Sequence, residues 1–284
     1  MKKGLVMEGG AMRGMFTCGV IDVLLENDIN VDGAIGVSAG ATFGCNYVSK
    51  QAGRALRYNK KFSRDPRYGS FKSLIKTGDY FGSFCYKELP NVYDVFDWDT
   101  FYGNPTEFWV VATDIESGDP VYHKCEASDD RGDADLQWFR ASASMPLFSN
   151  IVEIDGDKYL DGGISDAVPL EFFEGIGYEK NIVVLTQPIG YMKKPTKAMP
   201  VIAKKYADYP ELVDAMKHRH ENYNLNYEYI RERAGAGAAL IIAPDIPLSI
   251  GRIEKDPEEL ERVYNIGRKK GTEMLDAIRK FLED

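Results

Sequence analysis

Short apolar runs alternate with amphipathic stretches along the first fifty residues. The run "GLVMEGG" (4–10) ends in glycines, and "MFTCGVIDVLLEND" (15–28) carries Val20, Val23 and Leu24 at helical spacing. "VDGAIGVSAGATFGCNYVSKQ" (31–51) repeats this order, with small apolar residues first and a helical stretch second. Two successive strand–helix units predict a parallel sheet with helices on its faces.

Four later segments are rich in β-branched and aromatic residues and end at turn residues, which is typical of strands. They are "EFWVVATDI" (107–115), "PVYHK" (120–124), the hairpin-like "NIVEIDGDKYLDGG" (150–163) with an Asp155-Gly156 turn, and "NIVVLTQP" (181–188). Residues 1–195 are therefore expected to form one α/β domain, a three-layer α/β/α arrangement around a mostly parallel central sheet.

Residues 196–284 follow a different, helical pattern. "YPELVDAMKHRHENYNLNYEYIRERAG" (209–235) predicts a long charged helix, and "AALIIAP" (238–244) predicts one more buried strand at the sheet edge. Asp256 as N-cap, Pro257 at the first position and Glu259 at the third predict a capping box. One apolar stripe then predicts a single last helix, formed by Leu260, Val263, Gly267, Gly271, Leu275, Ile278 and Leu282. We expect a helical extension packed on the core, with no visible chemistry.

Residues 58–102 are unusually aromatic. They hold 13 aromatic side chains in 45 positions, against 12% for the whole chain. One interpretation is that loops and short helices use these rings to attach themselves to the domain surface. The other is an aromatic cap or insertion over an apolar substrate site. Both interpretations stay open.

Composition narrows the classes of partner. The net charge is −9 and basic residues form no run, which argues against nucleic acid and against charge-driven binding to anionic lipid. The four cysteines are widely spaced without a C-x-x-C pair, which favours free thiols in the cytoplasm over disulfides or a zinc site. No apolar run reaches the length of a membrane span. Transient membrane contact and the oligomeric state stay open.

The pentapeptide "GVSAG" (36–40) fits G-x-S-x-G, the pattern of a sharp strand-to-helix turn that exposes a serine hydroxyl. Gly36 and Gly40 would let strand and helix approach closely. Ser38 is thus either a nucleophile or a serine in an ordinary turn. A nucleophile also needs a base and donors for the developing oxyanion.

Oxyanion donors are expected in "EGGAMRG" (8–14), where glycines and a helix start expose backbone N–H groups. A P-loop would need lysine after Gly14, and a dinucleotide fingerprint would need G-x-G-x-x-G; neither pattern is present. The alternative is a tight turn joining strand to helix. Arg13, at the helix start, is expected to anchor this loop to a carbonyl or a carboxylate.

A base is harder to find among the histidines. His218 and His220 point to different faces of a charged helix and are expected to be solvated, and His123 beside Lys124 is a poor candidate. A carboxylate is the remaining class. Asp161 ends an apolar strand before Gly162 and Gly163, but taken alone this pattern equally fits an Asx-turn.

Four motifs together, "EGGAMRG", "GVSAG", "RASASMPLF" (140–148) and "LDGGISDAVPL" (160–170), resemble in order and interval those of the patatin-like phospholipases. The resemblance covers roughly residues 4–190 and is closer to bacterial cytosolic members than to plant storage patatins. It implies a lipid acyl-ester hydrolase in which Ser38 is the nucleophile and Asp161 the base of a Ser-Asp dyad without histidine.

The resemblance further implies an oxyanion hole made by the N–H groups of Gly9, Gly10 and Ala11, with Arg13 and Gly14 supporting the loop. Neither a metal nor another cofactor is implied. The family loop commonly begins with Asp and has a third glycine, where this chain has Glu8 and Ala11. A positive φ at Ala11 would strain the backbone.

The substrate is expected to be a lipid or another small acyl ester. An apolar pocket would suit such a substrate. It would also partly desolvate the Asp161 carboxylate, which would raise the pKa of Asp161 and make it a better base. Two other functions stay open: a catalytically silent acyl-binding or regulatory module, and an acyltransferase on the same fold.

Overall fold

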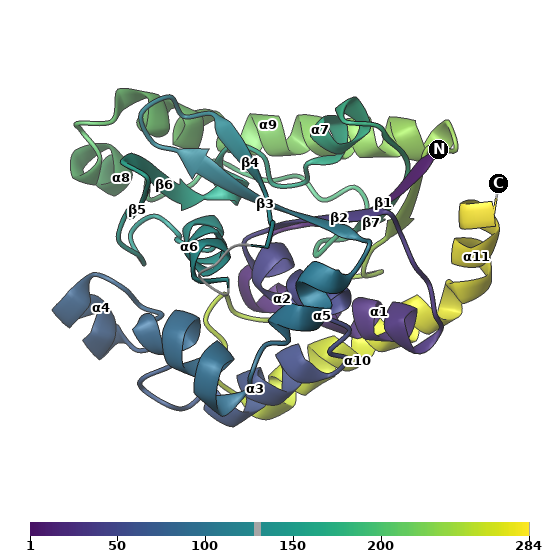
Figure 1. Ribbon diagram of the computed structural model, residues 1–284. Helices are drawn as coiled ribbons and strands as arrows, with labels where there is room; N and C mark the ends of the chain where they lie inside the picture. The colour runs from purple at the N-terminus through teal and green to yellow at the C-terminus, as the bar shows by residue number, and fades with distance from the viewer. Residues whose placement is uncertain (128–131, 284) are drawn as a thin grey trace.

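The computed structural model describes residues 1–127 and 132–283. Within them, one eight-stranded sheet separates two layers of helices (Figure 1). The strands are β1 (Lys2–Met7), β2 (Gly33–Val37), β3 (Glu107–Asp114), β4 (Pro120–Lys124), β5 (Val152–Ile154), β6 (Asp157–Asp161), β7 (Tyr178–Val184) and β8 (Ala239–Ile242). The predicted three-layer α/β fold is confirmed.

The helices lie on both faces of the sheet, with α7, α8 and α9 on one and α1, α2, α5 and α10 on the other (Figure 1). The longer ones are α1 (Gly14–Glu26), α2 (Ala39–Val48), α3 (Arg54–Phe62), α6 (Asp133–Ser142), α9 (Pro210–Gly235), α10 (Pro257–Glu273) and α11 (Leu275–Glu283). The shorter ones are η1 (Ala11–Arg13), α4 (Phe71–Thr77), the π-helix η2 (Phe84–Tyr93), α5 (Trp98–Gly103), η3 (Gly162–Ile164), α7 (Leu170–Gly175) and α8 (Met199–Lys205).

The centre of the sheet is parallel, in the order β3-β2-β1-β7-β8. All five residues of β2 are buried, as expected for a strand covered by helices on both faces. β4 and β6 run antiparallel to β3, and β5 and β6 form the predicted hairpin. Asp155 and Gly156 both have positive φ in its turn, at 54° and 94°, as a tight two-residue turn requires.

The pairing of β3 decides which residues meet at the end of β2. Val111 pairs with Val37 of β2 and also with β4, so β2 and β4 lie on opposite edges of β3. The next residue, Ala112, pairs with β4 and with Asp161 of β6. β6 therefore continues along the edge where β2 stops, and its last residue faces the residue that follows β2.

The C-terminal part is built into the same sheet. β8 pairs with β7 at the edge, as the sequence predicts, whereas the domain boundary at residue 195 stays a prediction. α10 crosses α1 so closely that a Cβ on Gly267 would lie 2.0 Å from the Phe16 carbonyl oxygen. The predicted single last helix is wrong, because the chain forms α10 and α11 with Met274 between them.

The structure confirms Asp256 as the N-cap of α10 but not the capping box with Glu259. The Asp256 carboxylate accepts from the Glu258 N–H at 3.3 Å, as an N-cap should. Glu259, however, pairs with Arg262 at 2.8 Å, while the Asp256 N–H donates to Glu254. The reciprocal capping box is therefore wrong, because nearer partners occupy both of the groups that it requires.

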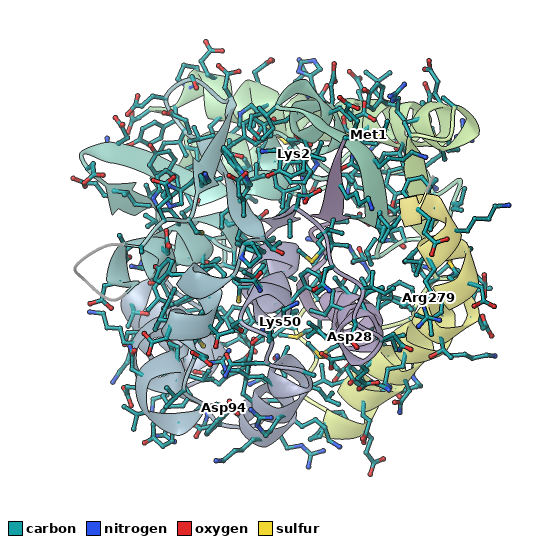
Figure 2. All side chains as sticks on the ribbon, turned by 45° about the vertical axis from the view of Figure 1, so that its right-hand side comes forward. Met1, Lys2, Asp28, Lys50, Asp94 and Arg279 are labelled. Carbon is teal, nitrogen blue, oxygen red and sulfur yellow. The ribbon has the colours of Figure 1, made fainter. Side chains whose placement is uncertain are left out.

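The aromatic segment folds into α3, α4, η2 and α5 along one side of the molecule (Figure 1). Its rings pack against one another, for example Phe62 on Phe84 with centroids 5.3 Å apart. Asp94, labelled in Figure 2, lies 3.3 Å from Arg54 Nε and 2.8 Å from Arg57 Nη2. Asp94 thereby joins the end of η2 to α3, and Arg54 also donates to Asn46 of α2 at 3.1 Å, which attaches the segment to the body of the domain. No helix in the described ranges combines the length and apolarity that crossing a membrane requires.

Candidate active site

Ser38 occupies the turn between β2 and α2. Its φ of 54° and ψ of −118° are strained for a residue with a side chain, and such outliers often mark functional sites. The flanking glycines permit the turn: a Cβ on Gly36 would lie 2.2 Å from the Gly40 carbonyl oxygen, and one on Gly40 would lie 2.3 Å from that of Met7. The G-x-S-x-G pattern thus marks a true strand-to-helix turn here.

Asp161 meets Ser38 across the end of the sheet. Ser38 Oγ donates to Asp161 Oδ2 at 2.7 Å, and the Gly163 N–H donates to Asp161 Oδ1 at 2.8 Å. Both side chains are buried, at 7% and 5% exposure. Gly162 lets the chain turn beside β3, since a Cβ there would lie 2.2 Å from the Val111 carbonyl oxygen.

The electrostatics around Asp161 favour a basic carboxylate. Burial raises the pKa of the Asp161 carboxyl above its ordinary value, in the direction that the sequence predicts. The charge of Arg219 and the hydrogen bond from Ser38 lower this pKa again in part. The result is a carboxylate that accepts a proton more readily than an exposed aspartate.

The "RASASMPLF" block holds both residues in place. Ser142 Oγ accepts from the Ser38 N–H at 2.8 Å, and the Ser144 carbonyl accepts from the Asp161 N–H at 2.9 Å. The sequence pointed to this block as a motif but not to these roles. Their physical basis is that α6 ends where β2 and β6 meet, which only the fold shows.

The glycine-rich loop passes directly over Ser38. A Cβ on Gly9 would lie 3.3 Å from Ser38 Cβ. The Gly9 N–H already donates to the Ala167 carbonyl at 3.4 Å, whereas the N–H groups of Gly10 and Ala11 make no hydrogen bond to any described residue. Gly10 and Ala11 are therefore the residues of this loop whose N–H groups are free to donate to a bound group. Ala11 stands where the family commonly has a third glycine. Its φ is 48°, which is the strained backbone conformation that the sequence analysis anticipated for an alanine there.

Glu8 has a definite structural role at the start of this loop. Its carboxylate is fully buried and accepts from the Thr186 N–H at 2.5 Å, from Tyr223 at 2.5 Å and from Tyr227 at 3.1 Å. Both tyrosines belong to α9, so the C-terminal part braces the loop. This bracing role of the C-terminal part was not predicted from the sequence.

Arg13 is not the anchor that the sequence predicts. Within the described part of the chain its side chain makes no hydrogen bond or ion pair, and its Nε is buried without a partner. Gly14 does support the loop, because a Cβ there would lie 2.8 Å from Ala39 Cβ, so α1 and α2 start in close contact.

Within residues 1–127 and 132–283, none of the three histidines makes a hydrogen bond to Ser38 or Asp161. His218 Nδ1 lies 3.2 Å from Asp214 Oδ2. His220 is half-buried and lines a cavity, so the expectation that both histidines are solvated holds only for His218. His123 Nε2 lies 2.6 Å from Asp135.

One group of side chains has the spacing of metal ligands. The ligand atoms of His123, Cys125 and Asp135 all lie within 4.8 Å of one another. The hydrogen bond between His123 and Asp135 already accounts for this proximity. Burial, and to a lesser extent the charge of Asp135, raise the pKa of the Cys125 thiol well above its ordinary value.

Two cavities open from Ser38, and they share Ala11, Ser38 and Met145. The first, of about 110 Å³, is mainly apolar and lies beneath the aromatic segment. Its aromatic walls are Phe43, Tyr58, Tyr68, Phe81, Tyr86, Phe96, Trp98 and Phe139. Most of these rings come from residues 58–102, so this segment both packs on the domain and lines a cavity.

The second cavity, of about 430 Å³, is polar and contains Asp161. Its basic side chains are Arg13, Lys193, Lys194, Arg219 and Arg252. Arg219 of α9 donates from Nε to the Gly163 carbonyl, directly beside Asp161. The sequence analysis missed Lys193, Arg219 and Arg252, because nothing in a charged helix or loop signals which charges face a distant active site.

A family model described as patatin-like phospholipase matches residues 5–173, more than half of the chain. The chain belongs to this family. The resemblance that the four motifs indicate is thereby confirmed, and membership supports lipid ester hydrolysis in general terms. A second model, a domain of unknown function called DUF6363, matches residues 209–283.

Relatives cover the chain to different extents. An uncharacterized Escherichia coli protein, YjjU, is 26% identical over 99% of this chain and 79% of its own length. Lysophospholipase nte1 of Aspergillus fumigatus is 29% identical over 61% of this chain, which corresponds to only 11% of nte1. Among solved structures, VipD of Legionella pneumophila aligns with 97% of this chain and 67% of its own, with a TM-score of 0.49 and 13% identity.

Proposed function

We propose that this protein is a serine acyl-ester hydrolase that uses a Ser38–Asp161 dyad and an acyl-enzyme intermediate. The observation that carries the proposal is the 2.7 Å hydrogen bond from Ser38 Oγ to Asp161 Oδ2, made at a strained turn beneath a loop with free N–H groups. Nucleophile, base and oxyanion donors are the three parts that acyl transfer needs.

In the first half-reaction, Asp161 takes the proton of Ser38 as Oγ bonds to the ester carbonyl carbon. The carbonyl oxygen becomes an oxyanion, which the N–H groups of Gly10 and Ala11 stabilise. When the intermediate collapses, the C–O bond to the alcohol breaks and Asp161 returns the proton to the leaving oxygen. The acyl group is then esterified to Ser38.

In the second half-reaction, Asp161 takes a proton from water as the water oxygen attacks the acyl carbon. The bond to Ser38 Oγ breaks and the proton passes to that oxygen, which regenerates the hydroxyl and releases a carboxylic acid. The apolar cavity beside Ser38 suits the acyl chain throughout, because burying it there removes apolar surface from water.

Fluorophosphonate labelling tests the proposal without knowledge of the substrate. We expect the reagent to modify Ser38, as mapped by mass spectrometry of the labelled peptide, and Asp161→Asn to abolish the modification. An unlabelled Ser38 in folded protein would contradict the proposal and favour a silent acyl-binding module. Product analysis with an added alcohol acceptor separates hydrolysis from acyl transfer, because only transfer yields a new ester.

A further inference from the structure

The polar cavity beside the dyad has a charge opposite to that of the protein. The chain carries a net charge of −9, yet five basic side chains line this cavity. Among the described residues that line it, Asp161 is the one carboxylate. Glu8 lies behind the wall, fully buried, and its oxygens already accept three hydrogen bonds.

None of the five basic side chains makes an ion pair in the described part of the chain, although Arg219 lies beside Asp161 and the charge of Glu8 acts on Lys193. The buried Arg13 Nε also has no hydrogen-bond partner among the described residues. Burial and the neighbouring arginines lower the pKa of Lys193 to about 7. Cations that are partly desolvated and close together repel one another, so this arrangement costs free energy unless an anion joins it.

The position of the polar cavity relative to Ser38 indicates which molecule would bring such an anion. Ser38 lies at the junction of the apolar cavity and the polar one. An ester whose acyl chain enters the apolar cavity must direct its alcohol portion elsewhere, and the polar cavity is the space on the other side of Ser38. The basic groups are therefore placed to contact the alcohol portion of the substrate.

The polar cavity is poorly suited to a cationic head group. A quaternary ammonium prefers a carboxylate or an open aromatic face. Asp161 is engaged by Ser38 and Gly163, and Lys193 Nζ already lies 3.9 Å from the ring centroid of Tyr223. A phosphate monoester, by contrast, offers several acceptor oxygens to arginine and lysine donors.

We propose that Arg13, Lys193, Arg219 and Arg252 form an anion subsite that binds the phosphate monoester of an acylated glycerol phosphate during hydrolysis of its acyl ester. The assignment rests on the proposed esterase function and specifies its substrate class. It also gives the C-terminal part of the chain a role, because Lys193, Arg219 and Arg252 all lie beyond the residues that the patatin-like model matches.

The first experiment compares three esters of one fatty acid, with glycerol phosphate, glycerophosphocholine and glycerol as the alcohols. The wild type should give the highest kcat/KM with the phosphate monoester. Arg252→Gln, at the exposed rim, and Lys193→Gln should each lower the preference for phosphate over glycerol by roughly tenfold, mainly through KM. Lys197→Gln, an exposed lysine outside the cavity, is the matched control and should leave the preference intact.

The second experiment measures binding without turnover. Ser38→Ala protein is titrated with glycerol phosphate and with inorganic phosphate by calorimetry, and Arg252→Gln in the same background should weaken binding of glycerol phosphate. Stronger binding of glycerol phosphate than of inorganic phosphate supports a substrate subsite; equal binding overturns the substrate assignment and leaves a site for free phosphate.

The two experiments separate failure of the subsite from failure of the esterase. A wild type that prefers glycerophosphocholine, or that ignores the alcohol, overturns the anion subsite while the esterase stands. Absence of Ser38 labelling by fluorophosphonate together with tight, Arg252-dependent binding of glycerol phosphate overturns the esterase and leaves the anion site. Absence of both overturns both.

Discussion

The two cavities that meet at Ser38 differ in almost every physical property. The apolar one lies beneath the aromatic segment, within the part of the chain that matches the family model. The polar one takes most of its basic side chains from residues after 190. The apolar cavity is lined by packed aromatic rings, whereas the polar cavity is lined by basic side chains that form no ion pair in the described part of the chain.

This difference suggests a division of roles along the chain. The four family motifs build the centre where an ester bond could be broken, and that centre is common to both cavities. Segments outside these motifs supply most of the apolar wall and four of the five basic side chains of the polar wall, and these walls would determine the acyl chain and the head group. Substrate selectivity is therefore expected to change with substitutions in regions where the sequence shows no motif.

The largest expected effect comes from disabling the proposed dyad, whose Ser38 both cavities share. Asp161→Asn removes the proton acceptor, so hydrolysis of every ester should fall by at least roughly a thousandfold in kcat. Steady-state kinetics on a chromogenic ester would measure it. Asp157→Asn, on the exposed end of the same strand, is the matched control and should retain activity. Full activity of Asp161→Asn would exclude Asp161 as the base.

A second substitution should affect the apolar cavity alone. Cys85→Phe, in the aromatic segment and outside the four motifs, adds a ring to a narrow cavity, and overpacking of this kind costs about 1–3 kcal/mol, so long-chain esters should lose roughly tenfold or more in kcat/KM while acetyl esters change little. A chain-length series measures this. Ala198→Phe, on the wall of the polar cavity, should leave the chain-length preference unchanged. An equal loss for all chain lengths would argue against an acyl cavity.

A third substitution tests the electrostatic link between the polar cavity and the dyad. The charge of Arg219 lowers the pKa of Asp161, so Arg219→Leu should let burial raise this pKa further. Since the base must be deprotonated, the acid limb of the kcat/KM profile for a neutral ester should move to higher pH.

Arg252→Gln provides the comparison, because Arg252 has a weaker effect on Asp161 and its removal should shift the limb less. Circular dichroism across the same pH range confirms that each variant stays folded. An acid limb that moved to lower pH in Arg219→Leu would show that Arg219 does not act through the charge of Asp161.

The smallest effect is expected at the outer surface of the aromatic segment. Phe71 and Ile75 of α4 are 60% and 86% exposed, and Phe71 contacts Tyr80, which contacts Phe81 of the apolar cavity. If α4 touches a lipid surface, Phe71→Ser with Ile75→Ser should lower activity on vesicles a few-fold and leave monomeric esters unaffected. Vesicle sedimentation would check binding directly, and equal binding by the variant would exclude this contact.

Much of the fold was accessible from local patterns. The first two strand–helix units, the Asp155-Gly156 hairpin, the edge strand at β8 and the long helix α9 all appear where periodicity and turn residues predict them. Errors arose where a pattern fits two outcomes. One apolar stripe predicted a single last helix, where the chain forms α10 and α11. The spacing of Asp256 and Glu259 predicted a capping box, but Glu254 accepts from the Asp256 N–H and Arg262 pairs with the Glu259 carboxylate.

In the candidate site too, local sequence patterns indicated some residues and missed others. Motif patterns indicated Ser38, Asp161 and the glycine loop, because each depends on a local backbone requirement such as a sharp turn or free N–H groups. The same reasoning misjudged Arg13 and gave no role to Ser142, Tyr223 or Arg219. The contacts of these side chains depend on elements that are distant in the chain, so no local sequence pattern indicates them.

The sequence by itself determined which segments form strands and helices and which residue types could act as nucleophile, base and donor, because these follow from side-chain periodicity and backbone sterics over a few residues. Only the tertiary structure decided that Ser38 meets Asp161 and that a ring-lined cavity faces a cationic one. β2 and β6 share one edge of β3, and α9 crosses above them, so residues more than a hundred positions apart come within hydrogen-bond reach. Such contacts arise from strand pairing and helix packing, which act between segments and leave no periodic signal within them.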